Sequence, residues 1–253
     1  MSINNLPTGD DKPGTRRNRG FIASAVFLGL VVVLAIAVIA TRGSDKSDAP
    51  AASGPGASTG AAVTPSSPAA ATGNACGLTD TNQTPPTSTP KDVTWQLVKG
   101  DAMPTSKSAG PGKVDGPVAH CYAHTPLGAL IAVSQIGDRL GVASNADAIQ
   151  ILKAQAVPGP GVETGLKALA GPEIGDGKAD GQLAGFQFAS YTPDTAVINL
   201  VSHMDNGSYN VATFTMKWLD GDWKIQLQDT GADSSNVSQV TSTAGYVPWS
   251  GVS

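Results

Sequence analysis

The stretch AVINLVSHMDNGSYNVATFTMKWLDGDWKIQL, residues 196–227, decides the fold of this 253-residue chain. It contains three runs in which apolar and polar side chains alternate, and a period of two is typical of β-strands with one apolar face. Asn206-Gly207 and Asp220-Gly221 separate the runs. Asn-Gly is a strong hairpin signal because both central residues of the tight turn need positive φ. With a preceding strand that carries Phe186 and Phe188 on one side, the sequence predicts a four-stranded antiparallel meander.

Working outward from the meander, three helices are predicted before it. Thr125-Pro126 combines a capping hydroxyl with a proline at the first helical position, so one helix begins there. Ser144 or Asn145 caps a second helix, which ends before Val157, and a shorter third helix covers 163–170. With a possible extra strand at 93–99, the fold class is α+β. Helices pack on one face of a curved four- to five-stranded sheet, with a core at about 93–229.

A hydrophobic segment lies near the N-terminus. Residues 21–40 carry no charge, and twenty such residues make a helix of about 30 Å, which matches the hydrocarbon thickness of a bilayer. Three arginines lie just before the segment, at positions 16, 17 and 19, and only Arg42 lies close behind it. The positive-inside rule therefore places residues 1–20 in the cytoplasm and the rest outside the cell membrane. A cleaved signal peptide is the alternative, although its apolar region would be shorter.

Residues 41–75 are rich in Ala, Pro, Ser, Thr and Gly and hold almost no large apolar side chain, which predicts a disordered linker. The extracytoplasmic domain then comprises residues 76–253. Its only cysteines, Cys76 and Cys121, would lie in an oxidising compartment, which favours a disulfide between them. Two buried free thiols or an intermolecular bridge are the alternatives.

The charge balance argues against nucleic acid as a partner. After Ala40 the chain has 12 Lys and Arg residues against 18 Asp and Glu residues, a formal charge of −6. Nucleic-acid binding needs a basic surface that releases counterions from the phosphates.

Two segments carry a resemblance to a known family. The segment YAHTPLGALIAV (122–133), followed by a second helix and a meander ending in WLDGDWKIQL (218–227), resembles actinobacterial membrane proteins encoded with conjugative elements. The resemblance spans about 93–229 and implies an outer domain with the cone-shaped fold of nuclear-transport-factor-like proteins. The plan of the chain is also similar to inner-membrane assembly factors of type IV secretion channels. These motifs are caps and turns, which specify a fold rather than a reaction.

Metal and phosphate sites are not indicated. His120, Cys121 and His124 are close in sequence, but Pro126 places both histidines before the helix. No glutamate or other third ligand has a suitable spacing from the two histidines. The segment 176–181 is similar to a calcium loop, but Lys178 stands where an oxygen ligand is needed. We therefore expect no metal ion and no cofactor.

Catalytic residues are not indicated either, and we expect no enzyme. Tyr191 and His203, at strand ends, are weak candidates for a pocket between the sheet and the helices; Asp194 lies in a turn. Trp218 and Trp223 flank the last turn and are candidates for a partner surface, although tryptophan on the apolar face of a hairpin is more often core.

The sequence therefore predicts a membrane-anchored extracytoplasmic protein-interaction module, a scaffold component of a conjugative transfer apparatus. Its expected partners are envelope proteins such as channel subunits, or a second copy of the chain. A small-ligand-binding protein, or a cone-fold isomerase or hydratase, are the alternatives.

Overall fold

The computed structural model describes residues 76–174, 177–179 and 181–251. The predicted cytoplasmic tail, membrane helix and linker (1–20, 21–40 and 41–75) lie outside this part of the chain. Within the described ranges, every helix is too short or too polar to cross a bilayer.

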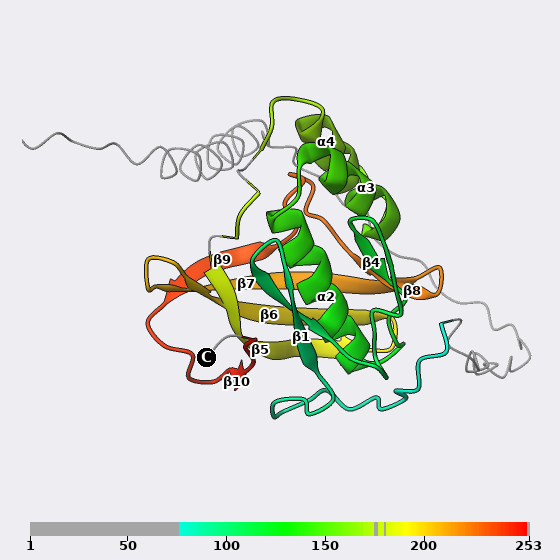
Figure 1. The fold of residues 1–253 in the computed structure, drawn as a ribbon, viewed down its shortest axis with the longest axis vertical. Coiled ribbons are helices and arrows are strands. Elements are labelled where there is room, and N and C mark those ends of the chain that lie inside the picture. Colours follow the sequence, from blue (N-terminus) through cyan, green and yellow to red (C-terminus); the bar gives the residue numbers. More distant parts are fainter. Residues whose placement is uncertain (1–75, 175–176, 180, 252–253) are drawn as a thin grey trace, which may run out of the picture. The chain divides into compact units, whose positions relative to one another are not determined.

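The domain is α+β, with three helices and a main sheet whose strands all pair antiparallel (Figure 1). The predicted meander forms the middle of this sheet in the order β5-β6-β7-β8, and β10 pairs with β5 at the edge. β8 pairs with the C-terminal part of β7, and β9 pairs with the N-terminal part of β7 on the same side. The strands are β5 (Gly181–Thr192), β6 (Thr195–Met204), β7 (Tyr209–Leu219), β8 (Asp222–Ile225), β9 (Ser235–Val240) and β10 (Val247–Pro248).

Two small hairpins precede the helices. The predicted strand at 93–99 is β1 (Thr94–Val98), but it pairs with β2 (Asp101–Thr105) in a separate sheet and does not extend the main one. The second hairpin joins β3 (Lys113–Asp115) to β4 (Val118–His120).

The predicted helix starts are confirmed for the first two helices. In α2 (Pro126–Gly141), the Thr125 hydroxyl accepts a hydrogen bond from the Gly128 N–H at 3.1 Å. In α3 (Asn145–Gln155), Ser144 is the cap, at 3.2 Å from the Asp147 N–H. The third helix, α4 (Pro160–Leu169), begins three residues before the predicted Glu163 because Pro160 occupies its first turn.

The two Xaa-Gly turns of the meander differ in geometry. Asp220 and Gly221 have φ of 55° and 79°, as a two-residue hairpin turn requires. At Asn206-Gly207 only Gly207 has positive φ, 83°, so the predicted geometry is wrong there. The Gly207 N–H donates to the Met204 carbonyl, and the Met204 N–H donates to the Ser208 carbonyl. This is a three-residue loop, a tight turn followed by one left-handed glycine.

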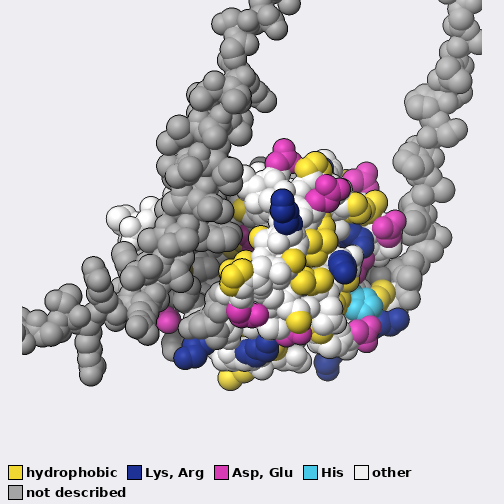
Figure 2. All heavy atoms as spheres, turned by 90° about the horizontal axis from the view of Figure 1, so that it is seen from above, with side chains coloured by type: hydrophobic (Ala, Val, Ile, Leu, Met, Phe, Trp, Pro, Cys, Tyr) yellow, Lys and Arg dark blue, Asp and Glu magenta, His cyan; other side chains and the backbone are white. Residues whose placement is uncertain are grey.

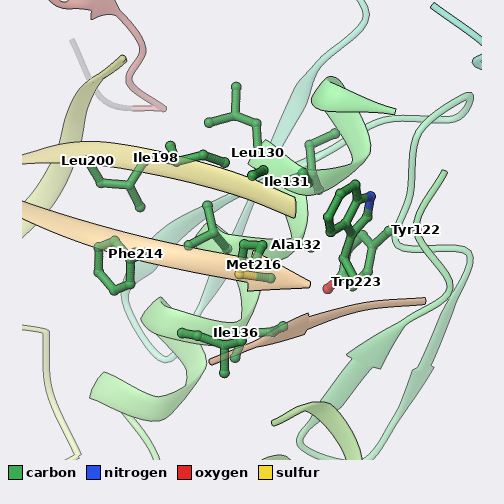
Figure 3. Close-up of a cluster of buried hydrophobic side chains, with 14 of the residues drawn as sticks. Tyr122, Leu130, Ile131, Ala132, Ile136, Ile198, Leu200, Phe214, Met216 and Trp223 are labelled. Atoms are coloured by element: carbon green, nitrogen blue, oxygen red, sulfur yellow. The ribbon is translucent and has the colours of Figure 1, made fainter. Parts of the chain in front are cut away.

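The core lies between α2 and the main sheet. Figure 3 shows Leu130, Ile131 and Ile136 of α2 packed against side chains of β6 and β7, among them Ile198 and Met216. All five are fully buried. Burying such a side chain contributes about 1.5–3 kcal/mol, so this layer supplies a large share of the stability.

The core extends beyond the predicted limits of about 93–229. Trp249, only 2% exposed, follows β10 and packs edge-on against Phe186. At the other end, Leu78 packs against the core, and the Thr79 and Asp80 N–H groups donate to the Ser108 carbonyl. The predicted Cys76–Cys121 disulfide is confirmed, with 5.8 Å between the two Cα atoms.

Candidate interaction site

Four residues that the sequence analysis singles out as candidates, not all for the same reason, converge near the N-terminal end of α2. We call this group the aromatic site: His124, Tyr191, Trp218 and Trp223. They come from the segment before α2, from the end of β5, and from the two sides of the Asp220-Gly221 turn. The register between β7 and β8 pairs Trp218 directly with Trp223. The short turn therefore fixes one half of the site.

The rings form a packed cluster. His124 lies parallel to Trp218, with 4.0 Å between ring centroids and 11° between planes. Trp223 meets Trp218 edge-on at 5.6 Å and His124 at 6.0 Å, and Tyr191 lies 6.3 Å from Trp223. Aromatic pairs of this kind contribute about 0.5–1.5 kcal/mol beyond the burial of their area, so the cluster is well defined.

Burial separates the floor of the site from its rim. Trp223 is fully buried, and its indole N–H donates to the Ala123 carbonyl at 2.9 Å. The prediction that Trp223 forms part of a partner surface is therefore wrong, because a fully buried ring cannot contact a partner. Trp218, His124 and Tyr191 are half-buried and form the rim. The prediction that Trp218 contacts a partner stays open.

Gln83 holds the rim in place. The Tyr191 hydroxyl donates to its side-chain oxygen at 2.8 Å, and the Gln83 amide nitrogen donates to the His124 carbonyl at 2.7 Å. The His124 Nε2 lies 2.6 Å from the Pro193 carbonyl oxygen. Because a carbonyl only accepts, Nε2 carries the proton. Sequence reasoning missed Gln83, whose polar neighbours along the chain give no sign of this contact.

Acidic residues lie near the rim. Burial, together with the nearby charges of Asp80 and Asp194, raises the pKa of Tyr191 to about 12. Asp194 is exposed, and its carbonyl accepts the backbone hydrogen bond of Trp218. Exposed Asp220 lies in the adjoining turn. Tyr191 is thus a neutral hydrogen-bond donor at physiological pH, and the site has a negative border.

Tyr191 and His203 do not share a pocket, contrary to the sequence-based expectation. Tyr191 pairs with Ala196 at one end of β6, whereas His203 lies near the other end, against the ring of Tyr209 at 4.9 Å. Ala196 and His203 are seven positions apart along the strand, a distance of about 23 Å. His203 is exposed.

The other residues that the sequence analysis considered either have structural roles or lie outside the described residues. His120 pairs with Asp115 through Nε2 at 2.8 Å, and Cys121 is in the disulfide. Among the described residues, no group of three histidine, cysteine or acidic side chains could hold a metal ion. Asp176 and Asp180 of the calcium-like segment are outside the described residues.

Side chains fill the space between α2 and the sheet (Figure 3). Two clefts lie elsewhere: one of about 300 Å³ where α2 meets α3, and one of about 430 Å³ beneath the segment 80–92. On the face seen in Figure 2, lysine and arginine side chains stand among acidic ones. That face therefore carries no continuous basic surface.

Comparison with known proteins identifies a family. Its sequence model covers residues 55–248, well over half of the chain and all of the helices and strands described above. No curated protein and no solved structure matches the chain. The chain therefore belongs to the family described as a domain of unknown function, DUF8175.

Proposed function

We propose that this chain is a membrane-anchored extracytoplasmic interaction module whose aromatic site binds a basic segment of a partner protein. The observation that carries the proposal is the half-buried Trp218–His124 stack in the same cluster as Tyr191, on which the charges of Asp80 and Asp194 act. Tryptophan, tyrosine and arginine are the residues that dominate binding energy at protein interfaces.

The chemistry of the rim favours a cationic partner. An arginine or lysine over an aromatic face gains about 0.5–2 kcal/mol from the ring quadrupole, and more when a carboxylate lies close by. Trp218 offers such a ring, and Asp80 and Asp194 supply the negative charge. The ring positions are fixed in advance by Gln83 and the Pro193 carbonyl, so binding would cost little side-chain entropy.

The proposed setting is the cell envelope. The apolar segment 21–40 would anchor the chain, and the linker 41–75 would let the domain reach partners tens of ångströms from the bilayer. The plan of the chain and its resemblance to proteins of conjugative elements support a scaffold role in a type IV secretion-like apparatus with a cone-like outer domain. We assign the chain no catalytic residue and no cofactor.

The test is crosslinking of the tagged full-length protein in intact cells, followed by affinity purification and mass spectrometry. We expect the wild type to recover other envelope proteins, such as channel subunits. Trp218→Ala should reduce their recovery about tenfold, the effect of losing one interface residue that contributes most of the binding energy.

Tyr209→Ala is the matched control, because Tyr209 is also half-buried and lies against a histidine ring, but at the opposite end of β7. It should leave recovery unchanged. Equal recovery with wild type and Trp218→Ala would refute the role of the aromatic site. Recovery of the protein alone would refute the scaffold proposal.

A further inference from the structure

A second site of opposite charge lies at the other end of α2. The Arg139 cleft, which has a volume of about 300 Å³, lies between the β1-β2 turn, the β3-β4 turn and the junction of α2 with α3. The residues used below are Val98, Lys99, Pro117, Arg139, Val142 and Asp147. From Thr125 to Arg139, α2 rises about 21 Å, so the cleft is separate from the aromatic site.

Arg139 is the only arginine among residues 76–251, and its side chain lines the cleft. The Nε–H donates to the Gln135 side-chain oxygen at 2.9 Å, and Nη1 lies 3.5 Å from the Pro117 carbonyl. A guanidinium group has five N–H donors, so these contacts orient its plane and leave three donors without a described partner.

The guanidinium has no anionic partner in the described part of the chain. The ion pairs described there include Lys99–Asp147 and His120–Asp115, and none of those described involves Arg139. Arg139 is half-buried, and this burial lowers its pKa, which reflects the cost of holding the charge away from water. Charges in such positions are normally paired. An unpaired, oriented guanidinium in a cleft is therefore a site prepared for an anion.

The second cation limits the charge of that anion. Lys99 Nζ lies 3.1 Å from the Val142 carbonyl oxygen and 3.4 Å from an Asp147 carboxylate oxygen, so Asp147 largely neutralises it. The cleft thus has about one unmatched positive charge. A singly charged carboxylate satisfies this balance, whereas a phosphate dianion would be repelled by Asp147.

Apolar groups supply the remaining walls. Val98, Pro117 and Val142 line the cleft beside the charged groups. A ligand with a carboxylate at one end and an apolar body would meet both kinds of wall, and burial of its body adds about 25 cal/mol for each Å² removed from water.

We propose that the Arg139 cleft binds a carboxylate group attached to an apolar body, with the guanidinium as its recognition element. The carboxylate accepts hydrogen bonds from the free N–H groups of Arg139, and the body lies against Val98, Pro117 and Val142. The ligand is either a small free acid or an acidic side chain of a protein segment. This inference does not depend on the aromatic site.

The experiment is calorimetric titration of the full-length protein in mild detergent with two probes. One is butyrate, a free acid, and the other is a capped peptide with one glutamate between two alanines. Butyramide and the same peptide with glutamine are the neutral controls. We expect at least one acid to bind at millimolar concentration and its amide not to bind. Preference for butyrate identifies a free acid as the ligand, and preference for the peptide identifies a protein segment.

Arg139→Gln should weaken binding of the preferred acid about tenfold or more, because charge-assisted bidentate contacts are lost. Arg139→Lys, which keeps the positive charge, should retain part of the affinity that Arg139→Gln loses. Lys167→Gln, which removes an exposed charge on α4, should have no effect. Lys99→Gln tests the cleft without changing Arg139 and should cause a smaller loss. Equal binding of acid and amide by the wild type, or wild-type affinity in folded Arg139→Gln, would overturn the proposal.

Discussion

At the scale of single residues, Asp101 shows how burial changes the ionisation of a carboxyl group in this domain. It is the first residue of β2 and is only 4% exposed. Burial raises its pKa from 3.8 to about 6, and hydrogen bonds from the Ala102 backbone and the Gln182 side chain oppose this rise. Burial also raises the pKa of Asp138 and of Asp233, and the charge of Asp101 raises that of Asp138 further.

We predict that Asp101→Asn stabilises the protein at neutral pH and not at acid pH. Because the folded pKa lies above the unfolded one, protonated Asp101 contributes stability that is fully present below pH 3.8 and is lost as the pH rises through about 6. Asparagine keeps the acceptor oxygen and has no charge. At about pH 8 the variant should gain on the order of 1 kcal/mol, after allowance for solvent screening.

Urea unfolding of both proteins at about pH 8 and about pH 4 measures the difference. A gain that is equal at the two pH values would show that the effect is not one of ionisation. A loss at both would show that the carboxylate is needed for a hydrogen bond that asparagine cannot replace.

At the scale of elements, the strands that alternate clearly were predictable and the others were not. Phe214, Met216 and Trp223 lie on the apolar face that the pattern of period two indicates. β2 was missed because Asp101 and Pro104 are unusual in strands. β9 was missed because its side chains are polar and mostly exposed, so neither face of the strand stands out. Pairing between strands distant in sequence, as for β10 with β5, leaves no local signal.

The two turns of the meander give a prediction at this scale. Asp220 has positive φ, which costs a side chain about 1 kcal/mol, so Asp220→Gly should be neutral or slightly stabilising. Asn206 does not have positive φ, and its side-chain oxygen accepts the Ser208 N–H at 2.9 Å. Asn206→Gly should therefore destabilise by about 1 kcal/mol, from the lost hydrogen bond and the greater freedom of the unfolded chain.

Thermal unfolding of both variants at one pH checks this pair. The sequence treats Asn-Gly and Asp-Gly as equivalent hairpin signals, so equal effects of the two glycine substitutions would contradict the turn geometries described here.

At the scale of the whole molecule, the sequence supplied the members of the aromatic site but not their arrangement. Trp218, Trp223, Tyr191 and His124 all stand out by residue type, but the sequence suggested three separate roles for them: a partner surface for both tryptophans, a pocket for Tyr191 and a metal cluster for His124. Their convergence depends on the β5-β6-β7-β8 order and on the entry of the chain into α2, which are long-range properties. The same limit applies to the Arg139 cleft, whose walls come from three segments distant in sequence.

The proposed topology gives the last prediction. Ser88 is exposed in the described segment before β1, and Ser2 belongs to the predicted cytoplasmic tail. Cys76 and Cys121 are joined in the disulfide, so an introduced cysteine would be the only reactive thiol. In intact cells, a maleimide that cannot cross membranes should label Ser88→Cys and should label Ser2→Cys only after lysis.

The wild type, with no free thiol, is the control for background labelling. Labelling of neither variant before lysis would place the domain in the cytoplasm, a reducing compartment in which disulfides are rare. Labelling of Ser88→Cys on a shortened chain released from the membrane would instead identify residues 21–40 as a cleaved signal peptide.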